Sequence, residues 1–350
     1  MKILYGIQGT GNGHLSRAEE IIPEFSKYAD VDVIISGNQS QLKSSFEINY
    51  NKSGLTFMAS KKGKVDLMST IFKSHPIDFI RDIKNFPIKQ YDLVISDFEP
   101  ISAWSALIHN VPSIELSHQA AVLHQSSPKP IKKDIISNYI LSHYCPTKLK
   151  FGFHFEEYDK QIYGPIIRDA VRQLEPSNSN HFTVYLPAYD NKRIFNVLSH
   201  FPVEWHVFSK YTTTEYTEKN VTFKPIDKES FTTSLISCDG ILCGAGFELP
   251  AEAMYLGKKL MVIPMSGQFE QECNAESLRR LGVTVLTELS LSFYRELNYW
   301  INFEKPIAVN FNNQLKNVVE DVLTAFENKQ IPEVNFERIL LNPQFYRYFF

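Results

Sequence analysis

Short apolar runs rich in β-branched residues alternate with longer stretches of helical spacing along most of this chain of 350 residues. In the first half, the helical stretches include 15–25 and 101–108. The apolar runs of that half are KILYGI (2–7), VDVIISG (31–37), LTFMAS (55–60), DLVISD (92–97) and SIELSH (113–118). Strands that alternate with helices predict βαβ units, in which a parallel sheet is covered by helices on both faces.

The alternation starts again after a polar stretch, QLEPSNSN (173–180). The second series of runs is FTVYLPA (182–188), VEWHVFS (203–209), VTFKPI (221–226), GILCGAG (240–246) and KLMVIPM (259–265). We therefore expect an α/β protein with two Rossmann-like doubly wound domains, over residues 1–165 and 181–330, joined by a linker at 166–180. The last segment, 331–350, is expected either to cross back to the first domain or to contact lipid.

Composition and charge narrow the class of protein. The chain is 43% hydrophobic and 21% charged, as globular proteins are, and its formal net charge of −3 gives no overall attraction for nucleic acid. Its four cysteines, Cys145, Cys238, Cys243 and Cys273, form no CxxC pair and no zinc-binding spacing, which favours buried reduced thiols in the cytoplasm. The apolar run after Lys2 is too short for a signal peptide, and no run is long enough to span a bilayer.

A glycine-rich turn, GTGNGHLSRA (9–18), follows the first predicted strand. Such a turn is typical of dinucleotide sites, but His14 replaces the third glycine, and the second strand ends in ISGN without an acidic residue for a ribose. We expect instead that the glycines make room for an acceptor and that His14 removes its proton. The other residues expected in this acceptor loop are Gly11, Asn12, Gly13 and Arg17.

Asp97 ends the predicted strand DLVISD, at the sheet edge to which the first strand delivers His14. A carboxylate bonded to one imidazole nitrogen fixes the tautomer and raises the basicity of the other nitrogen. Glu99 is a second candidate for this role. Helix capping remains the alternative for His14 and for Asp97.

A second glycine cluster lies in CDGILCGAGFELPAEAMYLGKKLMVIPMSGQFEQECNA (238–275). Gly244, Ala245 and Gly246 follow a predicted strand and precede a helix, whose bare N–H groups and dipole suit a pyrophosphate. Glu252, two turns into that helix, is expected to bind both hydroxyls of a ribose. The loop after the next strand carries polar groups able to bind sugar hydroxyls: Gln268, Glu270, Gln271 and Asn274.

This second cluster resembles the donor-binding signature of GT-B glycosyltransferases. It is similar to the branch that contains the N-acetylglucosaminyltransferase of peptidoglycan synthesis and the UDP-glycosyltransferases. Gln268 has a weaker counterpart there, and the positions that match the family motif well are Gly244, Ala245, Gly246, Glu252, Glu270, Gln271 and Asn274. GTGNGHLSRA resembles the family's GH loop, DLVISD the strand that ends in the aspartate partner, and GPIIR (164–168) the linker. The likeness covers most of the chain, with strong motifs at 6–18, 92–118, 163–168 and 238–275.

The resemblance implies a GT-B fold, with two Rossmann-like domains facing each other across a cleft. It implies transfer of a sugar from a nucleoside diphosphate, with UDP the expected carrier, to an acceptor hydroxyl with inversion, in cell-surface polysaccharide or glycolipid synthesis. The amides of 244–248, including Phe247 and Glu248, are expected to stabilise the leaving diphosphate, without metal or cofactor. Two departures leave the donor sugar open: Gly244 replaces the histidine of many plant-type enzymes, and the pair Glu270-Gln271 is neither Gln-Gln nor Asp-Gln.

Two alternatives stay open: an enzyme like the non-hydrolysing UDP-sugar 2-epimerases, and a sugar-nucleotide-binding protein without catalysis. The acceptor cannot be identified from the sequence. The basic loop Lys61-Lys62-Gly63-Lys64 and the segment 66–80 are expected to form a solvated loop and a core-packed helix, or else to face an anionic membrane. We expect a cytoplasmic protein, with contact at the inner membrane surface as the open alternative.

Overall fold

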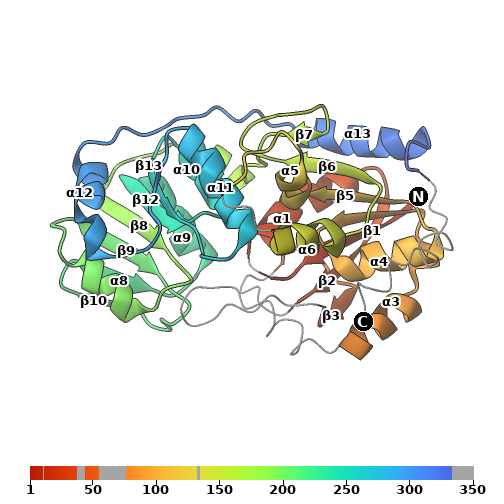
Figure 1. Cartoon of the computed structure of the whole chain (residues 1–350), viewed down its shortest axis with the longest axis horizontal. Helices are drawn as coiled ribbons and strands as arrows, with labels where there is room; N and C mark the ends of the chain where they lie inside the picture. The colour runs from red at the N-terminus through yellow and green to blue at the C-terminus, as the bar shows by residue number, and fades with distance from the viewer. Residues whose placement is uncertain (11, 38–43, 55–75, 132–134, 333–350) are drawn as a thin grey trace.

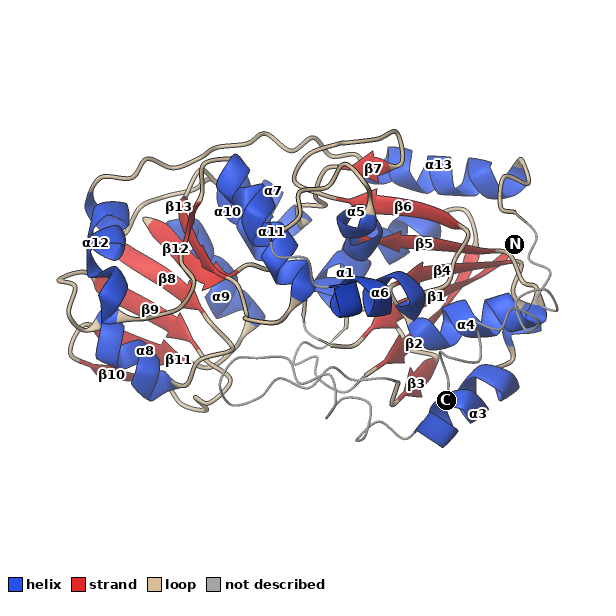
Figure 2. Ribbon diagram, in the orientation of Figure 1, coloured by secondary structure: helices blue, strands red, loops and turns tan. Residues whose placement is uncertain are grey.

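The computed structural model describes residues 1–10, 12–37, 44–54, 76–131 and 135–332. Two seven-stranded sheets lie side by side along the long axis of the molecule (Figure 1), and helices pack around each sheet (Figure 2). The strands of the first sheet come from residues 2–163 and those of the second from residues 181–285. The predicted α/β class with two mostly parallel sheets is confirmed.

The first sheet is parallel throughout, in the order β3-β2-β1-β4-β5-β6-β7. Its strands are β1 (Lys2–Gln8), β2 (Asp30–Ser36), β3 (Tyr50–Lys52), β4 (Leu93–Asp97), β5 (Ser113–Ser117), β6 (Leu149–Phe153) and β7 (Ile162–Tyr163). The helical segments of this half are α1 (Gly13–Phe25), α3 (Pro76–Asn85), η1 (Ile88–Gln90), α4 (Pro100–His109), α5 (His118–Leu123), α6 (Ile135–Tyr144) and α7 (Asp169–Arg172). Six of the seven residues of β1 are buried, as a parallel strand covered on both faces requires.

The second sheet has the order β10-β11-β9-β8-β12-β13-β14, and only β10 runs antiparallel to its neighbour. Its strands are β8 (His181–Tyr185), β9 (Glu204–Phe208), β10 (Tyr216–Glu218), β11 (Val221–Lys224), β12 (Gly240–Gly244), β13 (Lys259–Ile263) and β14 (Thr284–Val285). The remaining helical segments are α8 (Asn191–Leu198), α9 (Lys228–Ser237), α10 (Glu248–Tyr255), α11 (Phe269–Arg280), η2 (Leu291–Phe293), α12 (Tyr294–Asn302) and α13 (Leu315–Glu327). Both sheets change direction of strand addition next to their first strand, the point at which doubly wound folds bind ligands.

Nine of the ten predicted strands fall on strands of the structure, and the tenth, at 55–60, lies outside the described residues. The structure adds β3, β6, β7, β10 and β14, for which the sequence carries a weaker signal. β7 and β14 have two residues each, and all three residues of β10 are exposed. Such short edge strands, of which β3 with three residues is another, lack the apolar run that marks a buried strand. β6 is longer and lies inside the sheet, but polar Lys150 and Gly152 interrupt its apolar run.

After α12 the chain runs back along both halves to α13, which packs against α1 (Figure 1). The Tyr163 hydroxyl donates to Asp321 of α13 at 2.6 Å, and the Gly164 N–H donates to Gln314 at 3.2 Å. The chain therefore already returns to the first half at 303–314. The expectation for 331–350 stays a prediction, since 333–350 lie outside the described residues. The domain bounds stay a prediction: they assign α13 to the second domain, whereas it packs on the first.

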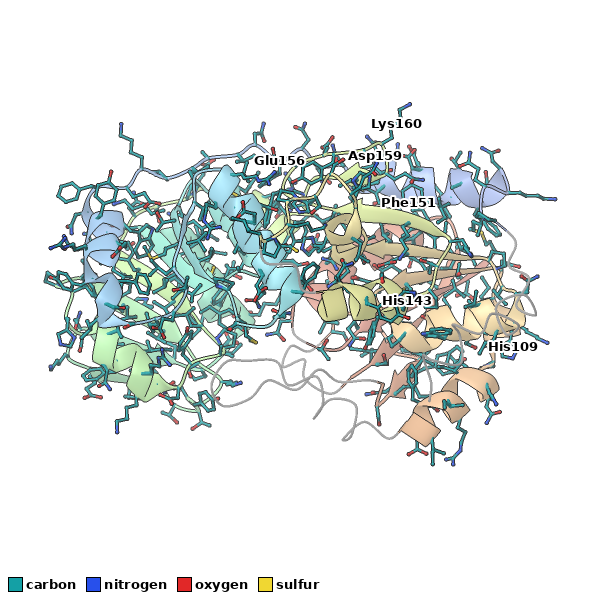
Figure 3. All side chains as sticks on the ribbon, in the orientation of Figure 1. His109, His143, Phe151, Glu156, Asp159 and Lys160 are labelled. Carbon is teal, nitrogen blue, oxygen red and sulfur yellow. The ribbon has the colours of Figure 1, made fainter. Side chains whose placement is uncertain are left out.

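The two halves also contact each other through apolar side chains. Phe155, in the loop after β6, packs against Phe247 at the start of α10, with 5.0 Å between ring centroids. The same loop carries Glu156 and Asp159 along the outer edge of the molecule (Figure 3), and its Tyr158 hydrogen-bonds with Ser277 of α11. One loop of the first half thus covers the junction with the second.

The segments proposed to face a membrane are only partly described. Lys61 to Lys64 lie outside the described residues, as does most of 66–80. The part that is described begins α3, where Ile77 and Ile80 are exposed rather than packed in a core. Within the described ranges, no helix is both long enough and apolar enough to cross a membrane.

Candidate active site

The turn after β1 places His14 in the first turn of α1, beside the end of β4. This happens because β1 and β4 are neighbours, with Ile7 in register with Asp97. Nδ1 of His14 donates a hydrogen bond to Oδ1 of Asp97 at 2.9 Å. The neutral ring then carries its lone pair on Nε2, the form that a general base requires. The structure therefore brings together the two residues predicted as catalytic.

Arg17, one turn further along α1, completes a buried charge cluster. Its Nη2 donates to both oxygens of Asp97 at 2.6 and 2.9 Å, and its Nε donates at 3.2 Å. Burial alone would raise the pKa of Asp97, but Arg17 and His14 outweigh it and hold that pKa below its usual value. Burial alone would lower the pKa of His14, but Asp97 outweighs it, so the pKa of His14 is raised and the ring is a stronger base.

Glu99, the second candidate for orienting His14, has a different role. Its carboxylate caps α4 by accepting from the N–H groups of Ile101 at 2.8 Å and Ser102 at 2.6 Å. It also accepts from the Ser36 hydroxyl at 2.6 Å. The side chain is fully buried, which raises the pKa of Glu99. The orienting partner is therefore not Glu99. Helix capping, the alternative that the sequence analysis left open for Asp97, is the role of Glu99 instead.

The glycine loop after β12 leaves open space beside its backbone. A methyl group at Gly246 would meet no other atom within 4 Å, and one at Gly244 would meet only ordinary contacts of 3.6 Å and longer. Neither glycine has a positive φ. The packing and the backbone conformation of the described protein therefore do not require glycine at these two positions.

The N-terminus of α10 follows this loop directly. Its N-cap residue, Phe247, makes no side-chain hydrogen bond to the helix, whereas Asp190 caps α8 and Asp227 caps α9. The first N–H groups of α10 are thus left for another partner, beside the open space at Gly246. Both features suit an anion that approaches the backbone closely.

Glu252, predicted to bind a ribose, is paired within the chain. Its two oxygens accept from Nε and Nη2 of Arg168 at 2.6 and 2.7 Å, and its side chain is 5% exposed. Arg168 ends the GPIIR stretch of the linker, so the sequence signal was present but its partner was not predicted. A ribose that binds Glu252 would have to share its carboxylate with Arg168 or displace Arg168 from it.

Gln268 and Gln271 lie at the start of α11. Oε1 of Gln271 accepts from the Met265 N–H at 2.9 Å, so this side chain stabilises the loop after β13. Oε1 of Gln268 is buried and has no hydrogen-bond partner in the part of the chain that the structure describes. The predicted sugar contacts of both residues stay predictions.

Asn274 is fully buried and links the two halves. Its Nδ2 donates to the carbonyl of Ala245 at 3.1 Å, and its Oδ1 lies 2.8 Å from Nε2 of His118. The His118 ring stacks on Phe247 at 4.0 Å, and burial lowers the pKa of His118. Asn274 therefore holds the glycine loop in place. A sugar could contact Asn274 directly only if the side chains that bury it moved away.

The predicted acceptor loop contacts the second half directly. Arg17 donates to Glu248 in the first turn of α10. A methyl group at Gly13 would collide with the Glu248 carboxylate, so glycine at this position permits the approach. Asn12 hydrogen-bonds with Tyr185 at the end of β8, whereas Gly11 lies outside the described residues. The loop thus contacts the second half, and its predicted role in acceptor binding stays a prediction.

Gln119 is a polar residue at the junction between the two halves, and the sequence analysis missed it. Its Nε2 donates to Oε2 of Glu270 at 2.8 Å and lies 3.4 Å from Nε2 of His14. It follows the strand SIELSH at the same sheet edge as Asp97, and this position was the available signal. Among the described residues, no group of His, Cys, Asp or Glu side chains is arranged to hold a metal ion.

Comparison with known proteins agrees with this geometry. The model of the family described as "Glycosyl transferase family 1" matches residues 1–297. No curated protein sequence matches the chain.

Three solved structures show the likeness in fold. The spinosyn forosaminyltransferase SpnP is 14% identical with a TM-score of 0.58, over 94% of this chain and 98% of that one. Phytolacca americana UGT2, complexed with UDP-2fluoro-glucose and pterostilbene, is 13% identical with a TM-score of 0.56, over 93% and 99%. MurG of Acinetobacter baumannii is 12% identical with a TM-score of 0.53, over 93% and 99%. The expected GT-B fold is confirmed.

Proposed function

Because this chain belongs to glycosyl transferase family 1 and is a glycosyltransferase, we propose that it moves a sugar from UDP to an acceptor hydroxyl with inversion. One observation carries the proposal. Arg17 joins the His14–Asp97 pair of the first half to Glu248, in the first turn of α10 after the glycine loop. A base and a site suited to a diphosphate therefore stand on the two sides of one junction.

On the acceptor side, Nε2 of His14 takes the proton of the hydroxyl as its oxygen attacks the anomeric carbon. The new bond to oxygen forms while the bond from that carbon to the diphosphate oxygen breaks, and the diphosphate leaves with the electron pair. Asp97 stabilises the imidazolium that results. A single displacement of this kind inverts the anomeric carbon.

On the donor side, the amides from Gly244 to Glu248 and the dipole of α10 would stabilise the charge on the departing diphosphate. Glu252 would bind the ribose in exchange for part of its pairing with Arg168. Glu270 and Gln271 would contact the donor sugar. The uracil nucleotide bound in the UGT2 structure supports UDP as the carrier.

Family membership favours this transferase over the epimerase-like and non-catalytic alternatives. The acceptor that we propose is a precursor of a cell-surface polysaccharide or glycolipid, met at the cytoplasmic side of the membrane. Both of these proposals rest on the family resemblance. Co-sedimentation with anionic vesicles tests the membrane contact, and release of UDP in an acceptor screen tests the acceptor class.

The first test of the proposal is nucleotide binding, measured by thermal unfolding and calorimetry. UDP or a UDP-sugar at about 100 times its Kd is expected to add about 2.7 kcal/mol to the free energy of unfolding. GDP and dTDP serve as matched nucleotides. No stabilisation by any nucleoside diphosphate would refute the donor site, and binding without transfer to any acceptor would support the non-catalytic alternative.

A further inference from the structure

Gln119 lies between the base and a residue of the donor half. It is the second residue of α5 and is only 2% exposed. Its Nε2 lies 2.8 Å from Oε2 of Glu270 on α11 and 3.4 Å from Nε2 of His14 on α1. One amide group thus contacts both sides of the junction.

The two neighbours determine how the amide of Gln119 is oriented. A carboxylate oxygen and an imidazole lone pair both accept hydrogen bonds, and only the NH₂ end of an amide donates two. The reverse orientation would place the carbonyl oxygen against the Glu270 carboxylate. In the observed orientation, Oε1 of Gln119 is buried without a hydrogen-bond partner among the described residues. The carbonyl end therefore adds nothing that holds the side chain in this position, and the contacts of the NH₂ end decide whether it stays.

The position of Gln119 has a consequence for catalysis. Nε2 of His14 is the atom that must receive the acceptor's proton, and in this structure its lone pair faces an N–H of Gln119. An acceptor hydroxyl has to replace that N–H. The stronger of the two contacts of Gln119 is the one to the charged Glu270, so Glu270 holds the amide over the base.

We propose that Gln119 is a positioning residue that links the availability of the base to occupation of the donor site. Sugar hydroxyls that bond to Glu270 compete with Gln119 for the carboxylate and release the amide from His14. The acceptor then reaches a free Nε2 only after the donor is bound. This inference rests on the proposed function, since it requires Glu270 to contact the donor sugar.

The test is the pKa of His14, measured by NMR in the wild type and in Gln119→Met, with and without UDP-glucose or UDP-N-acetylglucosamine. An N–H that donates to the neutral ring stabilises that form, so Gln119→Met without ligand is expected to raise the pKa of His14 by about half a unit. A bound donor should raise the pKa in the wild type by about half a unit more than in Gln119→Met. Gln173→Met, on the exposed linker, is the matched control and should behave as the wild type.

The comparison between variants cancels the other charges that face His14. These are Asp97 from β4, Arg17 from α1 and Glu248 from α10, together with the donor's own diphosphate. They act equally in both proteins, and what differs is Gln119 together with its hydrogen-bond partner Glu270. The His14 signal is assigned from its loss in His14→Asn, and Gln119→Leu replaces the methionine variant if that variant does not fold.

Equal pKa values of His14 in the ligand-free wild type and Gln119→Met would overturn the contact between Gln119 and the base. Equal donor-induced shifts in the two proteins, with binding intact by calorimetry, would overturn the coupling. If no UDP-sugar binds the wild type, the proposed function fails instead. The ligand-free comparison then still decides whether Gln119 reaches the base.

Discussion

The carboxyl edges of the two sheets differ in chemistry although the strand order is the same. The order β11-β9-β8-β12-β13-β14 in the second half repeats β3-β2-β1-β4-β5-β6 in the first. Between β1 and β4, the first edge holds ionisable side chains: His14, Arg17 and Asp97 are joined by hydrogen bonds. The helix that follows is uncapped at both edges. After β12, however, the second edge holds a glycine loop with open space at Gly246, and so presents backbone.

Under the proposed function, this difference lets one topology serve two tasks. Proton transfer needs one atom at a set position with a shifted pKa, and buried charged neighbours supply both for His14. A diphosphate carries charge on several oxygens and is bound by several N–H groups at once, which only bare backbone can bring close. The shared order of strands decides where the ligands meet, and the residues after each strand decide which half performs which task.

The assignment of proton transfer to the first half predicts the largest effect. His14→Ala is expected to lower turnover by about 10²–10⁴-fold. A hydroxyl that keeps its proton is a poor nucleophile, and a correctly placed base contributes about that factor. Nucleotide affinity should barely change, because the proposed diphosphate site lies on the other half. Steady-state release of UDP with matched nucleotide titrations measures both quantities.

His109→Ala is the control for this change. His109 ends α4, and among the described residues its ring hydrogen-bonds to the carbonyl of Ser105, within the same helix. Near-normal turnover in His14→Ala together with weakened binding of donor or acceptor would make the histidine a binding group. The contrast between the two halves would then be wrong.

Glu252→Ala tests a place where the second half does use a charged pair. The change leaves Arg168 buried without its carboxylate, and breaking such a pair is expected to lower the free energy of unfolding by about 3 kcal/mol. It should also remove most of the stabilisation by UDP, if Glu252 holds the ribose. Urea unfolding with and without UDP measures both.

Glu276→Ala is the matched change on the same half. Glu276 pairs with Arg279 along an exposed helix surface, so the expected loss is only about 0.5 kcal/mol. A UDP effect that persists in Glu252→Ala would remove Glu252 from the donor site and leave it as the structural partner of Arg168.

Gly246→Ala sharpens the assignment of backbone recognition to the second half. A methyl group at this position meets no other protein atom, so the melting temperature should not change. The affinity for UDP should fall on the order of tenfold, because the methyl group holds the phosphates away from the N–H groups.

Gly257→Ala gives the opposite result in the same half. Its φ of 62° is strained for alanine, so stability should fall by about 1 kcal/mol while UDP affinity is kept. If Gly246→Ala binds UDP as the wild type does, the diphosphate does not approach this loop closely.

The smallest effect concerns pH. In the proposed mechanism neutral His14 is the active form, so kcat/KM rises as pH rises through its pKa. Because that pKa is raised, the rise is expected at higher pH than for an ordinary histidine. Asp97→Asn removes the largest cause of the raised pKa, so the rise should move to lower pH. Turnover should fall less than in His14→Ala, because the base itself is kept. A rise at unchanged or higher pH would show that Asp97 does not control the basicity of His14.

The alternation of strand and helix, and the residues that end the strands, were predictable from the sequence. Carboxyl ends of neighbouring parallel strands share an edge, so His14 after β1 and Asp97 at the end of β4 could be expected to meet. The glycine loop could be predicted as well, because it lies between a predicted strand and a predicted helix. These features are local: a run of apolar residues, a turn and the residue that follows it.

Only the tertiary structure decided which partners those residues take. In the folded protein His14 hydrogen-bonds to Asp97 and not to Glu99, because the carboxylate of Glu99 caps α4. The tertiary structure also paired Arg17 with Glu248 across 231 positions, and placed Gln119 between the base and Glu270, 151 positions away. Such contacts depend on how the second half packs against the first, and no local pattern of apolar and polar residues encodes that packing.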